Sequence, residues 1–275
     1  MKRNLDPLTV DSFGDEWARF DQSAMTKEEA RRIFEDYFAI FPWADLPAKA
    51  SGFDMGCGSG RWAHLAAPRV GHLHCIDPSS ALGVARRTLA SHDNVTFHDA
   101  SVDDLPLPSG SQDFGYSLGV LHHVPDTADG IRSCASMLKR GAPFLVYLYY
   151  AFDNRPGAFR LVWRCSDWMR RVVHRLPSAA KGVVTDVIAL TVYLPFACAS
   201  RLLMRMGVGV TNVPLSYYHD HSWYTMRTDS RDRFGTPLEQ RFTRVEIQQM
   251  MEAAGLRDIC FSDEAPYWCA VGIKE

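Results

Sequence analysis

The feature that most constrains the fold is a regular alternation of short apolar runs and amphipathic segments over residues 52–150. The apolar runs have the length of strands, and the segments between them have the period of helices. This alternation predicts an α/β fold with a mostly parallel, doubly wound sheet. The expected strands are 52–55, 72–76, 95–98, 113–118 and 143–150, and the expected helices are 61–67, 79–90 and 127–138.

The alternation predicts four segments along the chain. Residues 1–50 form an N-terminal helical cap segment, and residues 51–150 form most of the core. Residues 151–235 are too long for a connection and too apolar for a disordered linker, so they are expected to be a helical lid or substrate insertion. Residues 236–275 complete the core with a helix and two strands, 243–254, 258–262 and 268–273, which brings the sheet to seven strands.

Composition excludes several classes of protein. The 275 residues carry a formal net charge of −2, so a general nucleic-acid binder is not expected. The seven cysteines are scattered without a C-x-x-C pair, which predicts neither a zinc site nor a disulfide framework and favours a reducing compartment. Acidic residues interrupt the first 17 positions, where a signal peptide would be apolar. We therefore expect a cytoplasmic protein whose mature and encoded chains coincide, with no metal ion.

Three glycines at alternate positions follow the first expected strand. Gly56, Gly58 and Gly60 belong to a D-x-G-x-G-x-G pattern that begins at Asp54, and they let the backbone approach a ligand closely. The dinucleotide fingerprint G-x-G-x-x-G fails, because its third glycine falls on Arg61. A Walker loop also fails, since no Gly-Lys-Ser or Gly-Lys-Thr follows.

Asp77 ends the second expected strand, where a carboxylate can accept both hydroxyls of a ribose. The glycine turn and this acid together indicate a nucleoside-containing cofactor. The alternative interpretation is structural: the glycines only make a tight turn, and Asp77 caps the next helix.

In combination these motifs resemble a class I S-adenosylmethionine-dependent methyltransferase of the small-molecule type, similar to the type 11 methyltransferases. The resemblance covers about 52–150 and 240–275, and it implies a Rossmann-like core with a helical cap insertion. The motifs that carry it are GFDMGCGSGRWA at 52–63, CIDPSSAL at 75–82, DDLPLPSGSQDFGYSLGVLHHVPD at 103–126, LKRGAPFLVYLYY at 138–150 and, more weakly, AGL at 254–256.

The resemblance also implies roles for particular residues toward S-adenosylmethionine. The three glycines would hold its methionyl part with Cys57 beside them, Asp54 would order its amino end, and Asp77 would bind the ribose next to Pro78 and Ser79. Many relatives place an acid four residues before the Leu-Pro pair to contact the adenine. This chain departs from that pattern with Ser101, followed by Val102, and Asp99 is the alternative contact. Leu118 and Gly119 would lie under the sulfonium.

Histidines are the candidate general bases. A methyl sulfonium is already electrophilic, so the protein mainly aligns the acceptor and, for an oxygen or nitrogen acceptor, removes a proton. His122 and His123 follow the fourth strand, and His219 and His221 lie in the insertion. The first pair has an alternative role in shaping a turn. Tyr224, Asp232 and Phe234 are candidate contacts to the substrate, and the His-x-His at 219–221 lacks further metal ligands at recognisable spacing.

The insertion is basic: residues 151–210 contain nine Lys or Arg against three Asp. One helical stripe is expected to gather Phe159, Val162, Trp163, Met169, Val172 and Val173, with Arg160, Arg164, Arg171 and His174 opposite. An uncharged run at 187–200 is shorter than the roughly 20 residues that span a bilayer. A lid over the acceptor site is the main interpretation. Peripheral membrane contact, a grip on a phosphate-bearing substrate and a homodimer contact are the alternatives.

The expected function is methyl transfer to a small-molecule acceptor, such as a natural product, a sugar or a lipid-linked intermediate. Two other classes remain open at this stage. One is an NAD(P)-dependent oxidoreductase, and the other is a non-catalytic, methyltransferase-like protein that binds S-adenosylmethionine.

Overall fold

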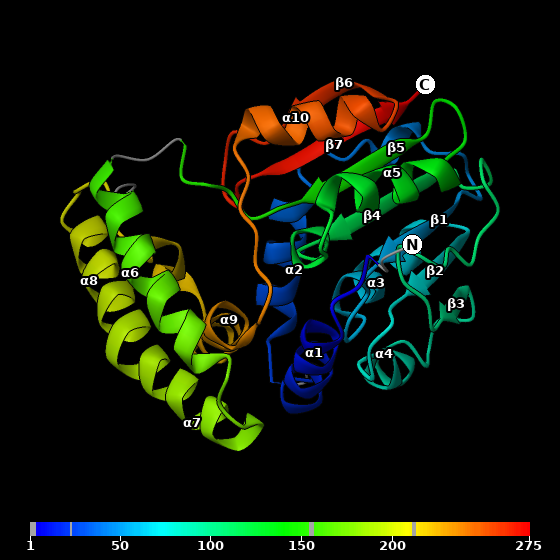
Figure 1. Cartoon of the computed structure of the whole chain (residues 1–275). Coiled ribbons are helices and arrows are strands. Elements are labelled where there is room, and N and C mark those ends of the chain that lie inside the picture. The colour runs from blue at the N-terminus through cyan, green and yellow to red at the C-terminus, as the bar shows by residue number, and fades with distance from the viewer. Residues whose placement is uncertain (1–3, 23, 154–156, 211–212) are drawn as a thin grey trace. The chain divides into compact units, whose positions relative to one another are not determined.

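The computed structural model describes residues 4–22, 24–153, 157–210 and 213–275. A seven-stranded sheet has the order β3-β2-β1-β4-β5-β7-β6, and β7 runs antiparallel to both of its neighbours (Figure 1). The mostly parallel sheet that the sequence predicts is thereby confirmed. Its strands are β1 (Ser51–Met55), β2 (His72–Ile76), β3 (Val95–His98), β4 (Phe114–Leu118), β5 (Pro143–Tyr147), β6 (Leu256–Phe261) and β7 (Cys269–Lys274).

Side-chain caps define where several helices begin. Asp6 caps α1, Asp126 caps α5, and Thr243 forms a full capping box with Glu246 at the start of α10. The helices are α1 (Pro7–Arg19), α2 (Lys27–Tyr37), α3 (Arg61–Ala66), α4 (Leu82–Thr88), α5 (Thr127–Met137), α6 (Gly157–Val173), α7 (Ser178–Ile188), α8 (Leu194–Arg205), α9 (Trp223–Gly235) and α10 (Arg244–Ala253).

Both faces of the sheet are covered, as the buried strands require. On one face, α5 and α10 pack over a cluster that includes Phe53, Phe144 and Met251. On the other face, Phe38 of the segment after α2 meets the ring of Tyr116 in β4 at 5.1 Å. All five residues of β4 are buried, so the core is centred on this strand.

Some predicted boundaries were wrong for local reasons. The helix expected from 79 begins only at Leu82, because the Ser79 backbone and hydroxyl both donate to Asp77. The strand expected over 143–150 ends at Tyr147, after which Tyr150 makes an isolated bridge to Phe242. A hydrogen bond between residues two positions apart thus sets the start of the helix, whereas the bridge to the distant Phe242 follows the end of the strand.

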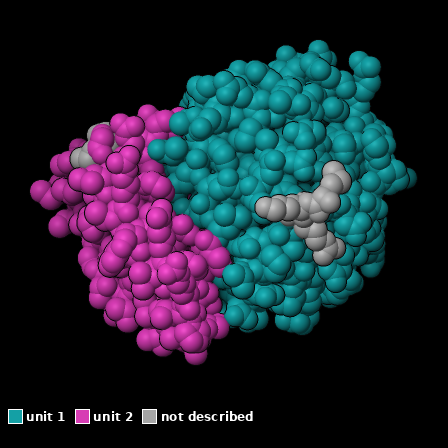
Figure 2. Space-filling model, in the orientation of Figure 1, with its two compact units in different colours: residues 1–21, 30–151, 238–275 teal, residues 22–29, 152–237 magenta. Residues whose placement is uncertain are grey.

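The chain divides into two compact units, drawn in different colours in Figure 2. The first comprises 1–21, 30–151 and 238–275, and it holds the sheet. The second comprises 22–29 and 152–237, and it holds α6 to α9. Its core gathers Val173, Ile188, Tyr193, Ala197, Met226 and Phe234.

The second unit contains one long helical run. A π-helical turn at Ala189–Tyr193 joins α7 to α8 without a break, so the uncharged run at 187–200 lies inside a helix of 28 residues, Ser178–Arg205. By length and composition this helix could cross a membrane, although one such helix is weak support for doing so. The uncharged run is as the sequence shows, but the helix that contains it is longer than the roughly 20 residues that span a bilayer.

The apolar stripe predicted for residues 159–173 was wrong in its composition. Val162, Met169 and Val172 are exposed on α6, whereas Val173 is buried. Arg170 is buried as well, because it donates to Asp167 and to the carbonyls of Thr236 and Pro237. The side chain of Phe159 lies outside the described residues.

Candidate active site

The glycine turn lies between β1 and α3, at the edge of the sheet where the parallel strands have their carboxyl ends. Gly56, Gly58 and Gly60 have φ values of 79°, 52° and 79°, a region that favours glycine. A Cβ atom on Gly56 would lie 2.4 Å from Cγ2 of Val120. The end of β2 holds the turn in place, because the backbone nitrogens of Gly56 and Cys57 donate to the Ile76 carbonyl at 2.7 and 3.2 Å.

Asp77 supports the same turn from the end of β2. Its Oδ2 accepts a hydrogen bond from the Gly58 backbone nitrogen at 2.8 Å, and its Oδ1 accepts from the backbone and hydroxyl of Ser79 at 2.8 and 2.6 Å. A carboxylate has about four acceptor positions, so Oδ2 retains capacity for a ligand hydroxyl. The Asp77 side chain thus stabilises the turn, so the alternative in which it has a structural role describes part of what it does.

Asp54 is a buried acid beside the turn. The side chain is 1% exposed, and within the described residues its Oδ2 has no hydrogen-bond partner. The pKa of Asp54 is raised to about 8: burial is the largest cause, the Tyr116 hydroxyl opposes the shift, and the charge of Asp77 adds to it. A ligand ammonium group would satisfy this oxygen and favour its ionised form. These residues therefore fit the amino end of S-adenosylmethionine.

The residues expected near the adenine follow β3, and those expected under the sulfonium lie at the end of β4. Val102 is buried in the core, and the Ser101 hydroxyl accepts from the Asp103 nitrogen at 3.3 Å. Asp99 is close enough for its charge to raise the pKa of Asp77, after the larger effect of burial. Leu118 ends β4, and the nitrogen of Gly119 donates to the Tyr147 carbonyl at 3.1 Å.

His122 and His123 form a short 3₁₀ turn, Leu121–His123, after β4. The Nδ1 of His123 lies 2.6 Å from the carbonyl oxygen of Leu238. Because a carbonyl only accepts, Nδ1 carries the proton, and the lone pair of the neutral ring is on Nε2.

His122 is fully buried and stacks on Tyr149 at 3.9 Å between ring centroids. Burial lowers its pKa well below the usual range, and the charges of His123 and Arg241 add to the shift. This ring is consequently neutral at physiological pH. Neither of its ring nitrogens has a hydrogen-bond partner within the described residues.

The remaining predicted site residues belong to the second unit. The His219 Nδ1 donates to the Ser216 carbonyl at 2.9 Å, and the buried His221 lies 3.1 Å from the Asp220 carboxylate. The Tyr224 hydroxyl accepts from the Gln22 nitrogen at 2.9 Å. Asp232 lies 3.4 Å from the Thr236 hydroxyl, and Phe234 is part of the unit's core. Within the described ranges, no group of three or more acidic, His or Cys residues could hold a metal ion.

The structure adds residues that the sequence pattern did not indicate. The Trp17 side chain, from α1, lies over Gly58: a Cβ atom there would be 3.0 Å from Nε1 of the indole. The Val120 side chain likewise occupies the space that a side chain at Gly56 would need. Trp17 is separated by 41 positions from Gly58 in a segment with no motif of its own, so only tertiary packing could identify it.

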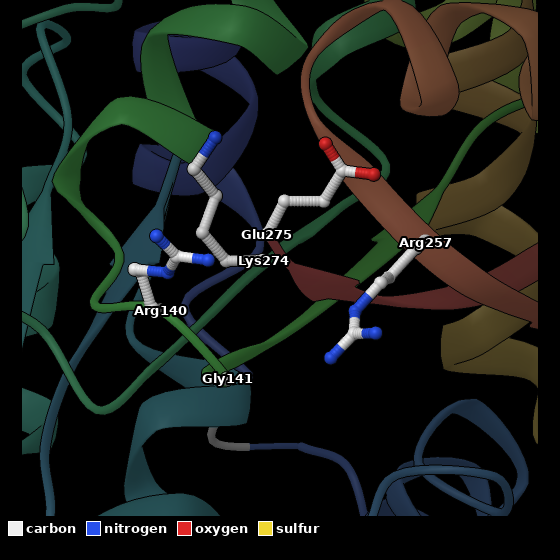
Figure 3. A pocket seen from close by; sticks show the side chains of 5 residues that line it. All are labelled: Arg140, Gly141, Arg257, Lys274 and Glu275. Carbon is white, nitrogen blue, oxygen red and sulfur yellow. The ribbon is translucent and has the colours of Figure 1, made fainter.

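One pocket lies away from this turn. It has a volume of about 500 Å³ and is lined by Arg140, Gly141, Arg257, Lys274 and Glu275 (Figure 3). Arg140 and Gly141 precede β5, whereas the glycine turn follows β1, which points the same way. The pocket is therefore at the opposite edge of the sheet and is not part of the cofactor site.

Comparisons with known proteins agree with this geometry. Residues 53–146 match the model of the methyltransferase domain. Over 147 residues the chain is 31% identical to the ubiquinone biosynthesis O-methyltransferase of Aromatoleum aromaticum, covering 51% of this chain and 62% of that protein. It is 27% identical to the 27-O-demethylrifamycin SV methyltransferase of Amycolatopsis mediterranei, and the match covers 89% of this chain and 82% of that protein. The chain thus spans less than two thirds of the ubiquinone relative.

Solved structures share the fold at low identity. A chain of the complex between the Haloferax volcanii Trm112 methyltransferase activator and a methyltransferase matches with a TM-score of 0.53 and 15% identity, over 96% of both chains. A Bacillus halodurans methyltransferase structure matches with a TM-score of 0.51 and 15% identity, over 83% of this chain and 72% of that one. The predicted fold is confirmed, and with its methyltransferase-domain match over residues 53–146 the chain is similar to the class I S-adenosylmethionine-dependent methyltransferases.

Proposed function

We propose that the protein transfers the methyl group of S-adenosylmethionine to an oxygen atom of a small-molecule acceptor, of the natural-product, sugar or lipid-linked kind. Two relatives support the choice of oxygen, because their names describe O-methylation of ubiquinone precursors and methylation at the 27-oxygen of a rifamycin. When bound, the cofactor supplies an electrophilic methyl group. The chain's own residues hold it, orient the acceptor and move a proton.

The observation that carries the proposal is the hydrogen bond between His123 and the Leu238 carbonyl. It keeps the proton on Nδ1, so Nε2 is the atom that can take the proton of an acceptor hydroxyl. The turn that bears this ring is held in place, since the Gln240 nitrogen donates to the His122 carbonyl at 3.0 Å and the Gln240 side chain donates to the Val124 carbonyl at 2.6 Å. His123 is therefore the proposed general base.

His122 is proposed to position this base. Its low pKa makes it a weak proton acceptor, and its stacking on Tyr149 orders the face of the turn next to His123. In the second unit, His219, His221, Tyr224 and Asp232 remain proposed contacts to the acceptor, and the lid role of residues 151–235 is part of the same proposal.

Calorimetry and an extract screen test this function. We expect S-adenosylhomocysteine to bind and NADH not to bind, because the third fingerprint glycine is replaced by Arg61. Cell extracts incubated with the protein and deuterium-labelled S-adenosylmethionine are expected to yield a product with a labelled methyl ether. If S-adenosylhomocysteine binds but no extract contains a labelled product, the protein is a binding protein without transfer activity.

A further inference from the structure

The second unit exposes an apolar stripe along α6. Leu161, Trp168 and Val172 are 63%, 70% and 52% exposed. Their spacing of seven and four residues places them on one side of the helix, with Cys165 between them. Large exposed apolar patches mark surfaces that bind a partner or a membrane.

The long helix Ser178–Arg205 carries a second stripe. Val183, Val187, Leu190 and Leu202 are between 51% and 64% exposed. They recur at helical spacing over 20 residues, and the exposed Cys198 lies on the same stripe. The stripe therefore extends along most of a helix that one turn of π-helix leaves unbroken.

The opposite sides of both helices are held by polar contacts to α9 and the residues after it. Asp186 forms a two-pronged ion pair with Arg227 at 2.9 Å, and the Ser230 hydroxyl donates to the Thr185 carbonyl at 2.8 Å. Arg170 of α6 binds the carbonyls of Thr236 and Pro237. If the long helix spanned the bilayer, it would have to abandon its contacts with Arg227 and Ser230 of α9. The stripes thus face away from α9, and this geometry suits a helix that lies parallel to a membrane surface better than one that spans the bilayer.

Exposed arginines run beside the stripe of α6. Arg160, Arg164 and Arg171 follow at intervals of four and seven residues, offset from Leu161 and Trp168 by about one position around the helix. The two acids of the helices, Asp167 and Asp186, are already paired with arginines. Between 157 and 210, the surface is therefore apolar and cationic, which complements anionic lipid headgroups over acyl chains.

We propose that the second unit docks on an anionic membrane surface, with the stripes of α6 and Ser178–Arg205 in the interface and the arginines at the headgroups. A second copy of the chain fits less well, because a symmetric contact would bring the arginine rows of the two copies together. This inference does not depend on the proposed function, although a membrane-bound enzyme would have direct access to a lipid-linked acceptor.

Vesicle flotation with the full chain tests the docking. At low salt, we expect the protein to float with vesicles of phosphatidylcholine and phosphatidylglycerol in equal parts, and much less with phosphatidylcholine alone. The double variant Leu161→Ser/Trp168→Ser should lower the partition coefficient about tenfold, because two apolar side chains no longer enter the interface. Val187→Ser/Leu202→Ser should act in the same way, and Arg160→Glu/Arg164→Glu should remove the preference for anionic lipid.

Matched controls lie in the first unit. Leu8→Ser/Val245→Ser replaces side chains that are 69% and 62% exposed, and Arg140→Glu reverses an exposed charge. These variants should float like the unchanged protein, and all variants should keep their affinity for S-adenosylhomocysteine. Protein that stays in the soluble fraction with anionic vesicles overturns the proposal. So does a lipid-free dimer, seen by sedimentation, that the Leu161→Ser/Trp168→Ser variant dissociates, since a second copy would then cover the face.

Discussion

The carboxylate of Asp77 accepts a hydrogen bond at 2.8 Å from the backbone nitrogen of Gly58, so the acid after β2 holds the turn after β1. The residue that would bind the ribose therefore also shapes the backbone that would receive the methionyl part. Because the two strands are adjacent and parallel, with Met55 paired to Ile76, their carboxyl ends bring the acid and the turn together.

Asp77→Asn is expected to weaken S-adenosylhomocysteine binding roughly tenfold to a hundredfold. The amide keeps one acceptor but loses the charge and places a donor against the Gly58 or Ser79 nitrogen, and a hydrogen bond to a charged group contributes about 1.5–3 kcal/mol. Calorimetric titration measures the affinity. Asp129→Asn, which breaks an exposed ion pair with Arg132, is the control and should bind normally. Equal affinity in both variants would place the ribose elsewhere.

Gly58→Ala is expected to lose S-adenosylhomocysteine binding and to lower stability. The new methyl group meets the Trp17 indole at 3.0 Å in addition to the strain of a φ of 52°. Gly110→Ala separates these effects, because Gly110 has a φ of 63° and open space around it. That variant should lose only about 1–2 kcal/mol of stability in urea unfolding and should keep its affinity. Similar binding losses in both variants would refute steric crowding at the turn.

Asp54 is expected to make the free energy of unfolding fall as pH rises from about 4 to about 8. Its pKa is about 8 in the folded chain and near 3.8 when exposed, so in that range the native state binds more protons than the unfolded state. Above pH 8 both states are ionised, and this contribution no longer changes. Urea unfolding of the wild type and of Asp54→Asn should diverge across this range, with the variant less sensitive to pH. Parallel curves would contradict a buried, neutral acid.

Binding of S-adenosylhomocysteine at pH 7 is expected to release a proton from Asp54. The side chain is mostly protonated in the free protein, and a ligand ammonium beside it would lower its pKa. Titrations in buffers with different ionisation enthalpies measure the number of protons exchanged. Asp54→Asn should abolish this release and weaken binding, whereas a release that persists in the variant would point to another group.

His123→Asn is expected to reduce kcat by about 100-fold or more while the affinity for S-adenosylhomocysteine stays unchanged. The asparagine amide can still donate to the Leu238 carbonyl in place of Nδ1, but it has no equivalent of Nε2. His123→Gln removes the bond to Leu238 and serves as the comparison for a structural effect. Full activity in His123→Asn would show that this ring is not the base.

Much of the core could be predicted from local patterns. The glycines of 56–60 and the acid at 77 are close in the chain to the strands that carry them, so strand, turn and helix identify their places at the sheet edge. The exposure of α6 could not be predicted in this way. Its apolar residues occupy two sides of the helix, and only packing against the other helices of the second unit determines that Val173 is buried and Trp168 is exposed.

The sequence by itself determined the alternation of strands and helices, the glycine turn and the resemblance to methyltransferases, because these depend on backbone conformation and on residues a few positions apart. The tertiary structure decided which side chains surround them. Trp17 lies over Gly58, and Leu238 sets the tautomer of His123, across 41 and 115 positions of chain. Such contacts form only when separate elements pack, and the packing depends on the whole chain rather than on any local pattern.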